Sequence, residues 1–470
     1  PDKFQEVVHD GVLSYLAQEY SEDVPAELAM TLVPGDLVDN GWAYDQWADT
    51  FFGPAHPLFA QVPVYPALGN HENDTEYYFQ YFHLPDNGSP GFEEHWWYLD
   101  YSNLRVVGLD SNGSYATQDQ LSWLEGVLDS TCEDQGIDFV FAQLHHPHKS
   151  ELWLPGESSW TGDVIALMES FSTECGKPSI HFFGHTHGYS RGQSRDHDHL
   201  WVNVATAGGA IDHWGDYPQS DYDEFTVTTA DWGFVLVDVD AGDSPQFRLQ
   251  RVSRGDDAVS LDNEIRDVVA VRRDNQAPDA PAALSPADGD GCAGEDDVPG
   301  PSPDSLVLVA SSYQDADGDL WGASHFQVSS TCDDFVDPQV DLWFQHENRY
   351  FEEDLQAADD LSDAVVEGLE GNSPYCWRVR YRDRGLRWSP WSIPAGFTTG
   401  DSALSANLLL NPGAEQGIEH WTVTEGVLES LTSGECDGRE PYDGDRYFAV
   451  GGLCEGESDY GEARQTVQLK

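Results

Sequence analysis

Short apolar runs, each ending in a glycine or a polar residue, alternate with segments of helical periodicity over residues 4–239. Leu28 to Val33 is followed by Pro34-Gly35-Asp36, and Val62 to Leu68 is followed by Gly69. Runs that are apolar at successive positions fit strands of a sheet covered on both faces. We therefore expect a layered α/β domain. Its other strands are expected at Arg105–Leu109, Phe139–Leu144, Ile180–Phe183, Trp201–Ala207 and Phe234–Val239, and its helices at Phe4–Leu16 and Gln118–Leu128.

Changes in composition divide the chain into three predicted domains. Residues 275–303 are rich in Pro, Gly and Asp, which is typical of a linker, so we assign the α/β domain to residues 1–273. Alternating strand sequence such as Tyr375–Tyr381 predicts a β-sandwich over residues 276–400. Part of a second all-β sandwich is expected at residues 404–470.

The charge of the chain excludes some classes of partner. It holds 22 Lys and Arg against 85 Asp and Glu, a formal net charge of −63. Such a surface repels nucleic-acid backbones and anionic membranes, so a nucleic-acid scaffold role is not expected. No apolar run approaches the roughly 18 residues of a membrane span, and none is expected.

Seven cysteines occur without a C-x-x-C pair or zinc-ribbon spacing. We interpret them as disulfides formed in an oxidising compartment, and so expect an extracellular, cell-surface or periplasmic protein. Buried free thiols in a cytosolic protein are the alternative. The chain begins Pro1-Asp2-Lys3, so any signal peptide is expected upstream. The expected pairs are Cys132–Cys175, Cys436–Cys454 and Cys332–Cys376, which leaves Cys292 unpaired or bonded outside the sequence.

Four polar segments stand at the ends of predicted strands. The carboxyl ends of strands in an open α/β sheet converge on one crevice, so these segments are expected to meet. Carboxylate, amide oxygen and imidazole together suit zinc, manganese or iron, and the sequence therefore predicts a metal site. The segments are Gly35-Asp36-Leu37-Val38-Asp39, Gly69-Asn70-His71-Glu72, His145-His146-Pro147 and Gly184-His185-Thr186-His187.

In this order the four segments resemble the calcineurin-like metallophosphoesterases. Gly184 to Arg191 is also similar to the G-H-x-H-x-Y-x-R segment of purple acid phosphatases. The resemblance implies a binuclear metal centre in a layered metallophosphoesterase fold. It implies that Asp36 bridges two ions, that Asn70, His145 and His185 complete one site, that His187 serves the other, and that His71 is the catalytic acid.

The chemistry of such a site leads to a predicted function. Two cations about 3.5–4 Å apart hold the phosphoryl oxygens and generate a hydroxide nucleophile, and a nearby imidazole protonates the leaving group. We expect a secreted enzyme that hydrolyses phosphate monoesters by attack of a metal-bridging hydroxide, with Asp36 and His71 catalytic. A phosphodiesterase or nucleotidase is the enzymatic alternative. From another class, a catalytically inert surface or matrix-binding protein is the alternative.

Two departures from the family pattern change what we expect. The first motif, an Asp-x-His at the end of the first strand, is absent, so that strand is expected upstream of Pro1. Only Asp36 and His187 remain for the second ion, which should bind weakly. Asp39 stands where purple acid phosphatases carry a metal-binding Tyr, so we predict no tyrosinate colour and a pair of Zn, Mn or Fe ions.

Other polar residues near the motifs have competing interpretations. His148, Lys149 and Arg191 are candidates for substrate contact. His146 is expected to point away from the site because adjacent strand residues face opposite sides. The segment Asp196-His197-Asp198-His199 is expected to be a solvated loop, and Asp110 to be structural.

The predicted C-terminal modules resemble binding domains. Tyr375–Tyr381, followed by Trp388-Ser389-Pro390-Trp391-Ser392, is similar to fibronectin type III domains. Asn407–Glu415 resembles the opening of galactose-binding and carbohydrate-binding jelly rolls, which implies attachment to polysaccharide or the cell envelope. Glu415 is either a calcium ligand of this module or a turn acid. Asp315-x-Asp317-Gly318-Asp319 lacks EF-hand spacing and is expected to be a turn.

Overall fold

The computed structural model describes residues 2–287, 300–357, 360–401, 414–416, 418–419, 421–425, 428–434, 445–450 and 462–464. The chain divides into two units. The first comprises Pro1–Asp290, Val307–Ala364 and Tyr375–Gly396. The second comprises Gly291–Leu306, Val365–Pro374 and Phe397–Lys470.

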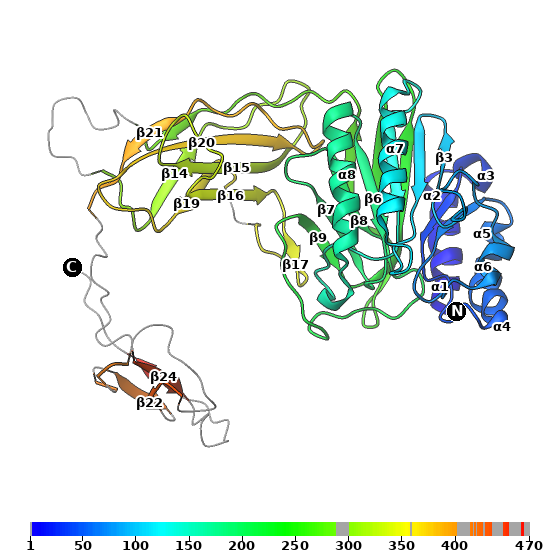
Figure 1. Ribbon diagram of the computed structural model, residues 1–470, viewed down its shortest axis with the longest axis horizontal. Coiled ribbons are helices and arrows are strands. Elements are labelled where there is room, and N and C mark those ends of the chain that lie inside the picture. Colours follow the sequence, from blue (N-terminus) through cyan, green and yellow to red (C-terminus); the bar gives the residue numbers. More distant parts are fainter. Residues whose placement is uncertain are drawn as a thin grey trace. The chain divides into compact units, whose positions relative to one another are not determined.

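A nine-stranded sheet forms the centre of the first unit, with the order β18-β17-β9-β7-β8-β6-β5-β4-β3 (Figure 1). Its middle strands β4, β5, β6 and β8 are parallel, as expected for runs apolar on both faces. The strands are β3 (Trp97–Tyr101), β4 (Leu104–Gly108), β5 (Phe139–Gln143), β6 (Ser179–Phe183), β7 (Tyr189–Gln193), β8 (His199–Asn203), β9 (Phe225–Thr229), β17 (Arg349–Tyr350) and β18 (Glu353–Asp354).

Two long helices, α7 (Gln118–Glu133) and α8 (Ser159–Cys175), cover one face of this sheet (Figure 1). The side chain of Thr117 accepts a hydrogen bond from the backbone N–H of Gln120, which caps the start of α7. Gly176 ends α8 with a positive φ of 60°. The apolar stripes of both helices pack on the strands; the cluster includes Leu121, Leu124, Leu128, Val164, Ile165, Met168, Val107, Val140 and Ala142.

The other face of the sheet packs against strands. Phe139 and Phe141 of β5 meet Phe247 edge to face, with ring centroids 5.2 and 5.3 Å apart. Phe247 belongs to an antiparallel sheet of three strands, and a separate parallel pair joins the same core. These strands are β10 (Trp232–Asp240), β11 (Gln246–Gly255) and β12 (Ser260–Arg272), and β1 (Thr31–Pro34) and β2 (Val64–Ala67).

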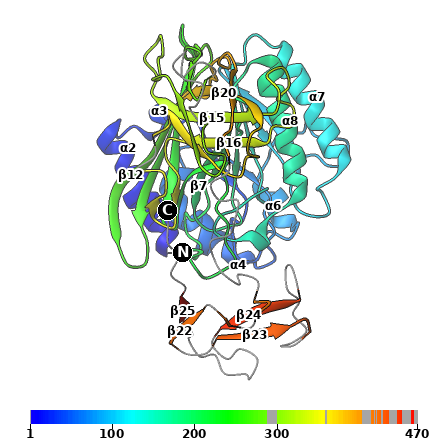
Figure 2. The same ribbon diagram turned by 90° about the vertical axis from the view of Figure 1, so that its left-hand side faces the viewer.

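Shorter helical segments belong to the N-terminal part of the first unit (Figure 2). The helix expected at Phe4–Leu16 is present as three consecutive segments. These three are α1 (Asp2–Glu6), η1 (Val7–Leu13) and α2 (Ser14–Glu19). The other short helical segments are α3 (Val24–Glu27), α4 (Tyr44–Gln46), η2 (Trp47–Phe52), α5 (Gly53–Phe59) and α6 (Glu76–Tyr81), with η3 (Leu154–Gly156) further along.

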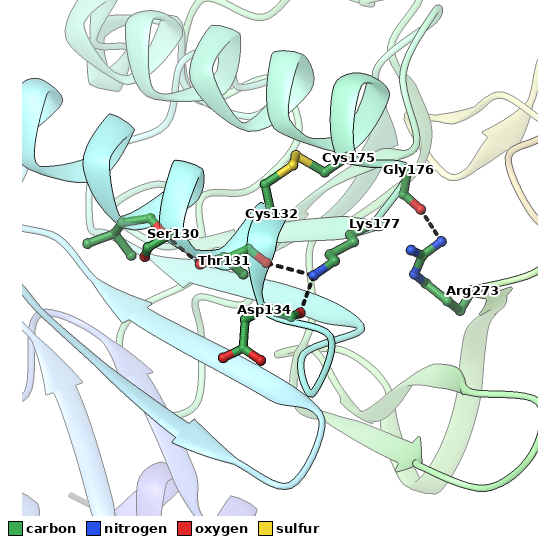
Figure 3. The surroundings of a disulfide bond; sticks show 9 residues. Ser130, Thr131, Cys132, Asp134, Cys175, Gly176, Lys177 and Arg273 are labelled. Atoms are coloured by element: carbon green, nitrogen blue, oxygen red, sulfur yellow. Dashed lines mark hydrogen bonds between the residues drawn. A yellow bond between two sulfur atoms is a disulfide. The ribbon is translucent and has the colours of Figure 1, made fainter.

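A disulfide joins the C-terminal ends of α7 and α8, as Figure 3 shows. The bond links Cys132 and Cys175, so this predicted pair is confirmed, and so is Cys332–Cys376. The buried Lys177 ammonium donates to the carbonyl oxygens of Thr131 and Asp134, each at 2.6 Å. It therefore satisfies carbonyls at the end of α7 that have no partner within the helix.

Strand register brings the candidate site segments to one edge. Gly108 of β4 pairs with Gln143 of β5, and Gln143 pairs with Phe182 of β6. The parallel strands therefore end together, and the chain leaves each of them on the same side. The β1–β2 pair is attached alongside, because Gln143 Nε2 donates to the carbonyl of Tyr65 on β2 at 2.7 Å.

Antiparallel strands follow the α/β region, in the stretch for which we expect a fibronectin type III-like module. Within the first unit β16-β15-β20 form one sheet, and β13 pairs with β14. The module assignments and the three domain boundaries remain predictions. The strands are β13 (Ala283–Ser285), β14 (Leu306–Ala310), β15 (Trp321–Ser329), β16 (Val340–Gln345), β19 (Asp363–Val366), β20 (Pro374–Asp383) and β21 (Ala395–Thr398).

These strands contact the α/β region directly. The buried Arg382 guanidinium donates to the carbonyls of Ser194 and His197, at 2.7 and 2.6 Å. Asp196 is ion-paired with Arg380, and His199 is buried on β8. Residues 196–198 form the expected loop, in which Asp196 is exposed, but His199 belongs to a buried strand, so the expectation of a solvated loop at 196–199 holds only in part.

The second unit contains two described strand pairs. β22 (Thr422–Glu425) pairs with β25 (Glu462–Arg464), and β23 (Leu428–Thr432) pairs with β24 (Arg446–Val450). Glu415 Oε1 accepts backbone hydrogen bonds from Asp445 and Arg446, each at 2.9 Å. Calcium in this module stays a prediction. The Asn407–Gly413 part of the jelly-roll motif, Cys292 and the Cys436–Cys454 pair lie outside the described residues.

Candidate metal centre

Four side chains predicted to bind one metal ion meet at a single point. His145 Nε2 lies 3.0 Å from Asp36 Oδ2, 3.0 Å from Asn70 Oδ1 and 3.1 Å from His185 Nδ1. Asp36 follows β1, Asn70 follows β2, His145 follows β5 and His185 follows β6. The common edge of the strands therefore brings together four side chains that are spread over residues 36 to 185 of the sequence.

Backbone strain occurs at two of these four positions. Asp36 and His185 adopt positive φ angles of 55° and 67°, which are uncommon for residues with a side chain. Gly69 must be small, because a Cβ there would lie 2.2 Å from Asp36 Oδ1. The position of the Asp36 carboxylate therefore requires two strained backbone conformations and a residue without a side chain at Gly69.

A buried carboxylate supports the Asp36 loop from behind. Glu72 accepts backbone hydrogen bonds from Gly69, Asp36 and Leu37, at 2.7, 2.9 and 2.7 Å. It is fully buried, and burial together with the neighbouring Asp36 charge raises its pKa to about 7. Glu72 therefore ties the two ligand loops together; the sequence analysis gave it no role, although it is the fourth residue of Gly69-Asn70-His71-Glu72.

The His145 ring is oriented by its second nitrogen. Nδ1 lies 2.9 Å from the carbonyl of Pro34 and donates to it, so Nε2 is the nitrogen that faces the other three atoms. Burial opposes protonation of this imidazole, but the Asp36 carboxylate outweighs burial and raises the pKa of His145. For Asp36 burial acts in the direction of a higher pKa, but His145 and the His71 N–H outweigh burial, and the pKa of Asp36 is lowered to about 2.

These atoms fit a metal ion. Burial and the proximity of His145 lower the pKa of His185 to about 3, so its ring is neutral and one of its nitrogens carries a lone pair. Two imidazole nitrogens, a carboxylate oxygen and an amide oxygen therefore converge, and a shared cation would relieve their mutual repulsion. Nitrogen and oxygen donors in this combination suit zinc, manganese or iron.

His146 is closer to the centre than the sequence predicts. It forms, with His145 and His185, one of the two groups of potential metal ligands among the described residues, and its ring centroid lies 4.4 Å from that of His185. The alternation of strand side chains does not apply, because β5 ends at Gln143. Its Nδ1 is 2.9 Å from Ser111 Oγ, so Nε2 is the nitrogen available to the site.

His71, the predicted acid, lies at the exposed rim of this cluster. Its Nδ1 is 2.6 Å from the carbonyl of Asp39 and donates to it, while Nε2 is 3.9 Å from Asp36 Oδ2. The side chain is 40% exposed. Nε2 is therefore placed where it can exchange protons both with solvent and with a molecule bound beside Asp36.

His187 is held separately from the four converging side chains. Its backbone N–H donates to Asp212 Oδ2 at 2.7 Å, and its Nδ1 lies 4.0 Å from Asp212 Oδ1. Asp212 comes from the loop between β8 and β9, which the sequence analysis did not connect with the site. A role of His187 for a second ion stays a prediction.

Three predicted substrate contacts are occupied elsewhere. Arg191 is only 4% exposed, and its Nε and Nη2 donate to Asp267 at 2.5 and 2.9 Å, so the expected substrate contact is not supported. Lys149 is paired with Glu224 at 2.7 Å. His148 Nδ1 lies 3.4 Å from the carbonyl of Ser158. Each charge or imidazole is bound by its own surroundings.

A pocket of about 270 Å³ adjoins the cluster at Asn70. His95 supports it from behind, with Nδ1 2.8 Å from the buried Asp110 carboxylate and its ring stacked on Tyr115. Asp110 thus has the structural role that the sequence predicts, and it also lines this pocket. The lining residues are Leu68, Asn70, Asn73, Asp74, Asp110, Asn112, Gly113, Ser114 and Tyr115.

The other group of potential ligands in the described part of the chain is Asp315, Asp317 and Asp319. Asp315 Oδ1 accepts backbone hydrogen bonds from Asp317, Gly318 and Asp319, at 3.1, 2.8 and 3.0 Å. The Arg272 guanidinium donates to Asp317 and Asp319. The segment is a turn in which one arginine offsets part of the charge of the three carboxylates.

Comparisons with known proteins agree with the predicted family. Residues 8–189 match the family model described as calcineurin-like phosphoesterase. Two curated relatives from Arabidopsis thaliana, named probable inactive purple acid phosphatases 24 and 27, are 22% and 23% identical over 52% of the chain. The chain spans 45% of the length of each.

A solved structure of a purple acid phosphatase from yellow lupin (Lupinus luteus) seeds is also similar, with 17% identity and a TM-score of 0.41. The match covers 55% of this chain and 48% of the lupin chain. Among the described residues, no helix is both long and apolar enough to cross a membrane.

Proposed function

We propose that the chain is a metal-dependent phosphoesterase that hydrolyses phosphate monoesters, with Asp36, Asn70, His145 and His185 holding a metal ion. The convergence of the other three donor atoms on His145 Nε2, at 3.0 to 3.1 Å, carries this proposal. A bound cation would neutralise charge on the phosphoryl oxygens and activate water for attack. The match to the calcineurin-like phosphoesterase family model makes phosphate esters the natural substrate class.

The chain's own residues divide the remaining work. Asp36 stays ionised, because its pKa is lowered to about 2, and so provides a negative ligand at neutral pH. Glu72 fixes the backbone of the Asp36 loop. His71 turns Nε2 toward Asp36, because its Nδ1–H is engaged by the carbonyl of Asp39, and as the catalytic acid it would give the Nε2 proton of its imidazolium form to the leaving-group oxygen. We also propose that His187 helps to bind a second metal ion.

A catalytically inert binding protein is the second candidate. The names of the two Arabidopsis relatives describe them as probably inactive, which favours this alternative. Two observations argue against an inert protein: the four donor atoms converge, and two of the residues that supply them have strained backbones. Binding by the C-terminal modules would not need this arrangement. A phosphodiesterase or nucleotidase of the same fold is the enzymatic alternative.

Hydrolysis assays on purified protein supplied with Zn²⁺, Mn²⁺ or Fe²⁺ test the proposal. The wild type should hydrolyse p-nitrophenyl phosphate faster than bis(p-nitrophenyl) phosphate, and Asp36→Asn should lose at least a hundredfold in kcat/KM. Asp45→Asn, an exposed change of the same kind on α4, is the matched control and should keep full activity. No hydrolysis with any of the three metals by a folded wild type would favour the inert binding protein.

Location and attachment form the last part of the proposal. The two disulfides are compatible with an oxidising compartment, and we propose secretion or exposure at the cell surface. The C-terminal modules would then bind polysaccharide or the cell envelope. Glycan pull-down with the full chain tests this attachment, and failure to bind any envelope polysaccharide would contradict it.

A further inference from the structure

The pocket beside Asn70 differs from what a phosphate-binding pocket needs. Among its lining residues, all of which the structure describes, there are two carboxylates and no Lys or Arg. The phosphoryl group therefore belongs at the metal centre, and the pocket is available for the rest of the ester. We propose that it binds the leaving-group alcohol and selects alcohols that carry a protonated amine. This inference rests on the proposed phosphomonoesterase function.

Hydrogen bonds inside the pocket wall engage amide donors of two of its asparagines. Asn73 Nδ2 donates to the carbonyl of His71 at 2.8 Å, and Asn112 Nδ2 donates to Asp110 Oδ1 at 2.9 Å. Each amide oxygen is therefore left to accept from a bound molecule. A ligand rich in N–H or O–H donors matches these acceptors, whereas a carboxylate does not.

Asp74 supplies the charge that distinguishes an ammonium from a hydroxyl group. Its Oδ2 accepts from the Tyr115 hydroxyl at 2.6 Å, while its Oδ1 is 3.7 Å from His95 Nε2, beyond hydrogen-bonding distance. The side chain is 49% exposed, so Oδ1 is open to a ligand. The buried Asp110 carboxylate, in contrast, is already shared by His95 and Asn112.

The backbone that presents Asp74 is strained. Asn73 and Asp74 are consecutive residues with positive φ angles of 53° and 54°, directly after the ligand loop that contains Asn70. Such strain concentrates at binding sites, where the surrounding structure must hold it. The Tyr115 hydrogen bond holds Asp74 in this conformation. The same turn that positions the metal ligand therefore aims a carboxylate at the leaving group.

The size of the pocket limits the alcohol. A volume of about 270 Å³ lies just below the usual range for small-molecule sites, roughly 300–1,000 Å³, so a small amino alcohol fits better than a nucleoside or a protein side chain with its backbone. Asn70 belongs both to this pocket and to the metal cluster. A short phosphate ester can thus extend from the metal cluster into the pocket.

Three phosphate monoesters of two-carbon alcohols test the proposal. O-phosphoethanolamine, 2-hydroxyethyl phosphate and phosphoglycolate end in an ammonium, a hydroxyl and a carboxylate group, respectively. We expect kcat/KM to decrease in that order. Asp74→Asn should lower the ammonium-to-hydroxyl ratio of kcat/KM about fivefold, as expected for a half-exposed charge pair. Comparing ratios cancels the different intrinsic reactivities of the three esters.

Two further variants serve as controls. Tyr115→Phe removes the hydrogen bond that holds Asp74 but keeps the charge of Asp74, so it should reduce the preference for the ammonium ester less than Asp74→Asn does. Asp129→Asn, an exposed carboxylate on α7, should leave the ratio unchanged. Melting curves of the three variants show whether each is folded.

Binding of the free alcohols gives a readout that does not depend on turnover. Saturation-transfer NMR should detect the ethanolammonium ion, but not ethylene glycol, on the wild type, and neither on Asp74→Asn. An unchanged ratio and equal binding by wild type and Asp74→Asn would overturn the inference while p-nitrophenyl phosphate hydrolysis still upheld the proposed function. If no ester is hydrolysed but ethanolammonium binds at Asp74, the proposed function fails and only an amine-binding pocket remains.

Discussion

Replacement of Gly69 by alanine should damage the metal centre although no metal-binding residue is replaced. The new Cβ would lie 2.2 Å from Asp36 Oδ1 and 2.3 Å from the Asp36 backbone nitrogen. Real Cβ contacts shorter than 3.0 Å essentially do not occur, so the carboxylate must retreat by about 0.8 Å, the difference between 2.2 and 3.0 Å. Its 3.0 Å contact with His145 Nε2 would then be lost or distorted.

The size of the effect follows from that displacement. A misplacement near 1 Å costs about a hundredfold in rate, equivalent to about 2.7 kcal/mol, and overpacking costs a further 1–3 kcal/mol of unfolding free energy. Calorimetric Zn²⁺ titration and p-nitrophenyl phosphate hydrolysis measure the first effect, and urea unfolding measures the second. Gly126→Ala, an exposed helical position with nothing within 4 Å, is the matched control and should stabilise α7 by up to about 1 kcal/mol. Wild-type metal affinity in Gly69→Ala would refute the reasoning.

Three further predictions concern stability. Replacing Cys132 and Cys175 by alanine should lower the unfolding free energy by about 2–4 kcal/mol, because the closed loop spans 43 residues; equal urea midpoints for oxidised wild type and variant would contradict this. Arg191→Leu leaves the buried Asp267 carboxylate unpaired and should cost about 3–5 kcal/mol in urea unfolding, with KM for p-nitrophenyl phosphate unchanged; a raised KM would restore Arg191 as a substrate contact. Burial raises the pKa of Glu151 to about 8, above its unfolded value of 4.5, so its contribution to stability is full below pH 4.5 and is lost as pH rises to 8. Wild type should therefore lose about 3–5 kcal/mol more than Glu151→Gln between pH 5 and 8, and parallel melting profiles would contradict this.

The sequence predicts the part of the site that depends on strand order. Asp36, Asn70, His145 and His185 each follow an apolar run, and parallel strands necessarily end on a common edge. Periodicity and motif spacing are local properties, so they can be recognised without coordinates. The strands at Phe139–Gln143 and Ser179–Phe183 begin and end within one residue of the expected positions.

Contacts between distant segments could not be predicted in this way. The pairing of Arg191 with Asp267 depends on β12, a strand that the sequence analysis did not identify. His146 points into the site because β5 ends two residues before His145, and element boundaries are the least certain feature of a sequence pattern. The contact between the 196–198 loop and Arg382 joins residues that are 185 positions apart in the chain.

Metal analysis of the purified chain tests the central claim most directly. After incubation with Zn²⁺, Mn²⁺ or Fe²⁺ and desalting, the wild type should retain at least one equivalent of metal, and His145→Gln should retain less than a tenth of that amount. His56→Gln, a change of the same kind outside the cluster, should retain as much as the wild type. Equal metal content in wild type and His145→Gln, with both proteins folded, would contradict a metal centre built on Asp36, Asn70, His145 and His185.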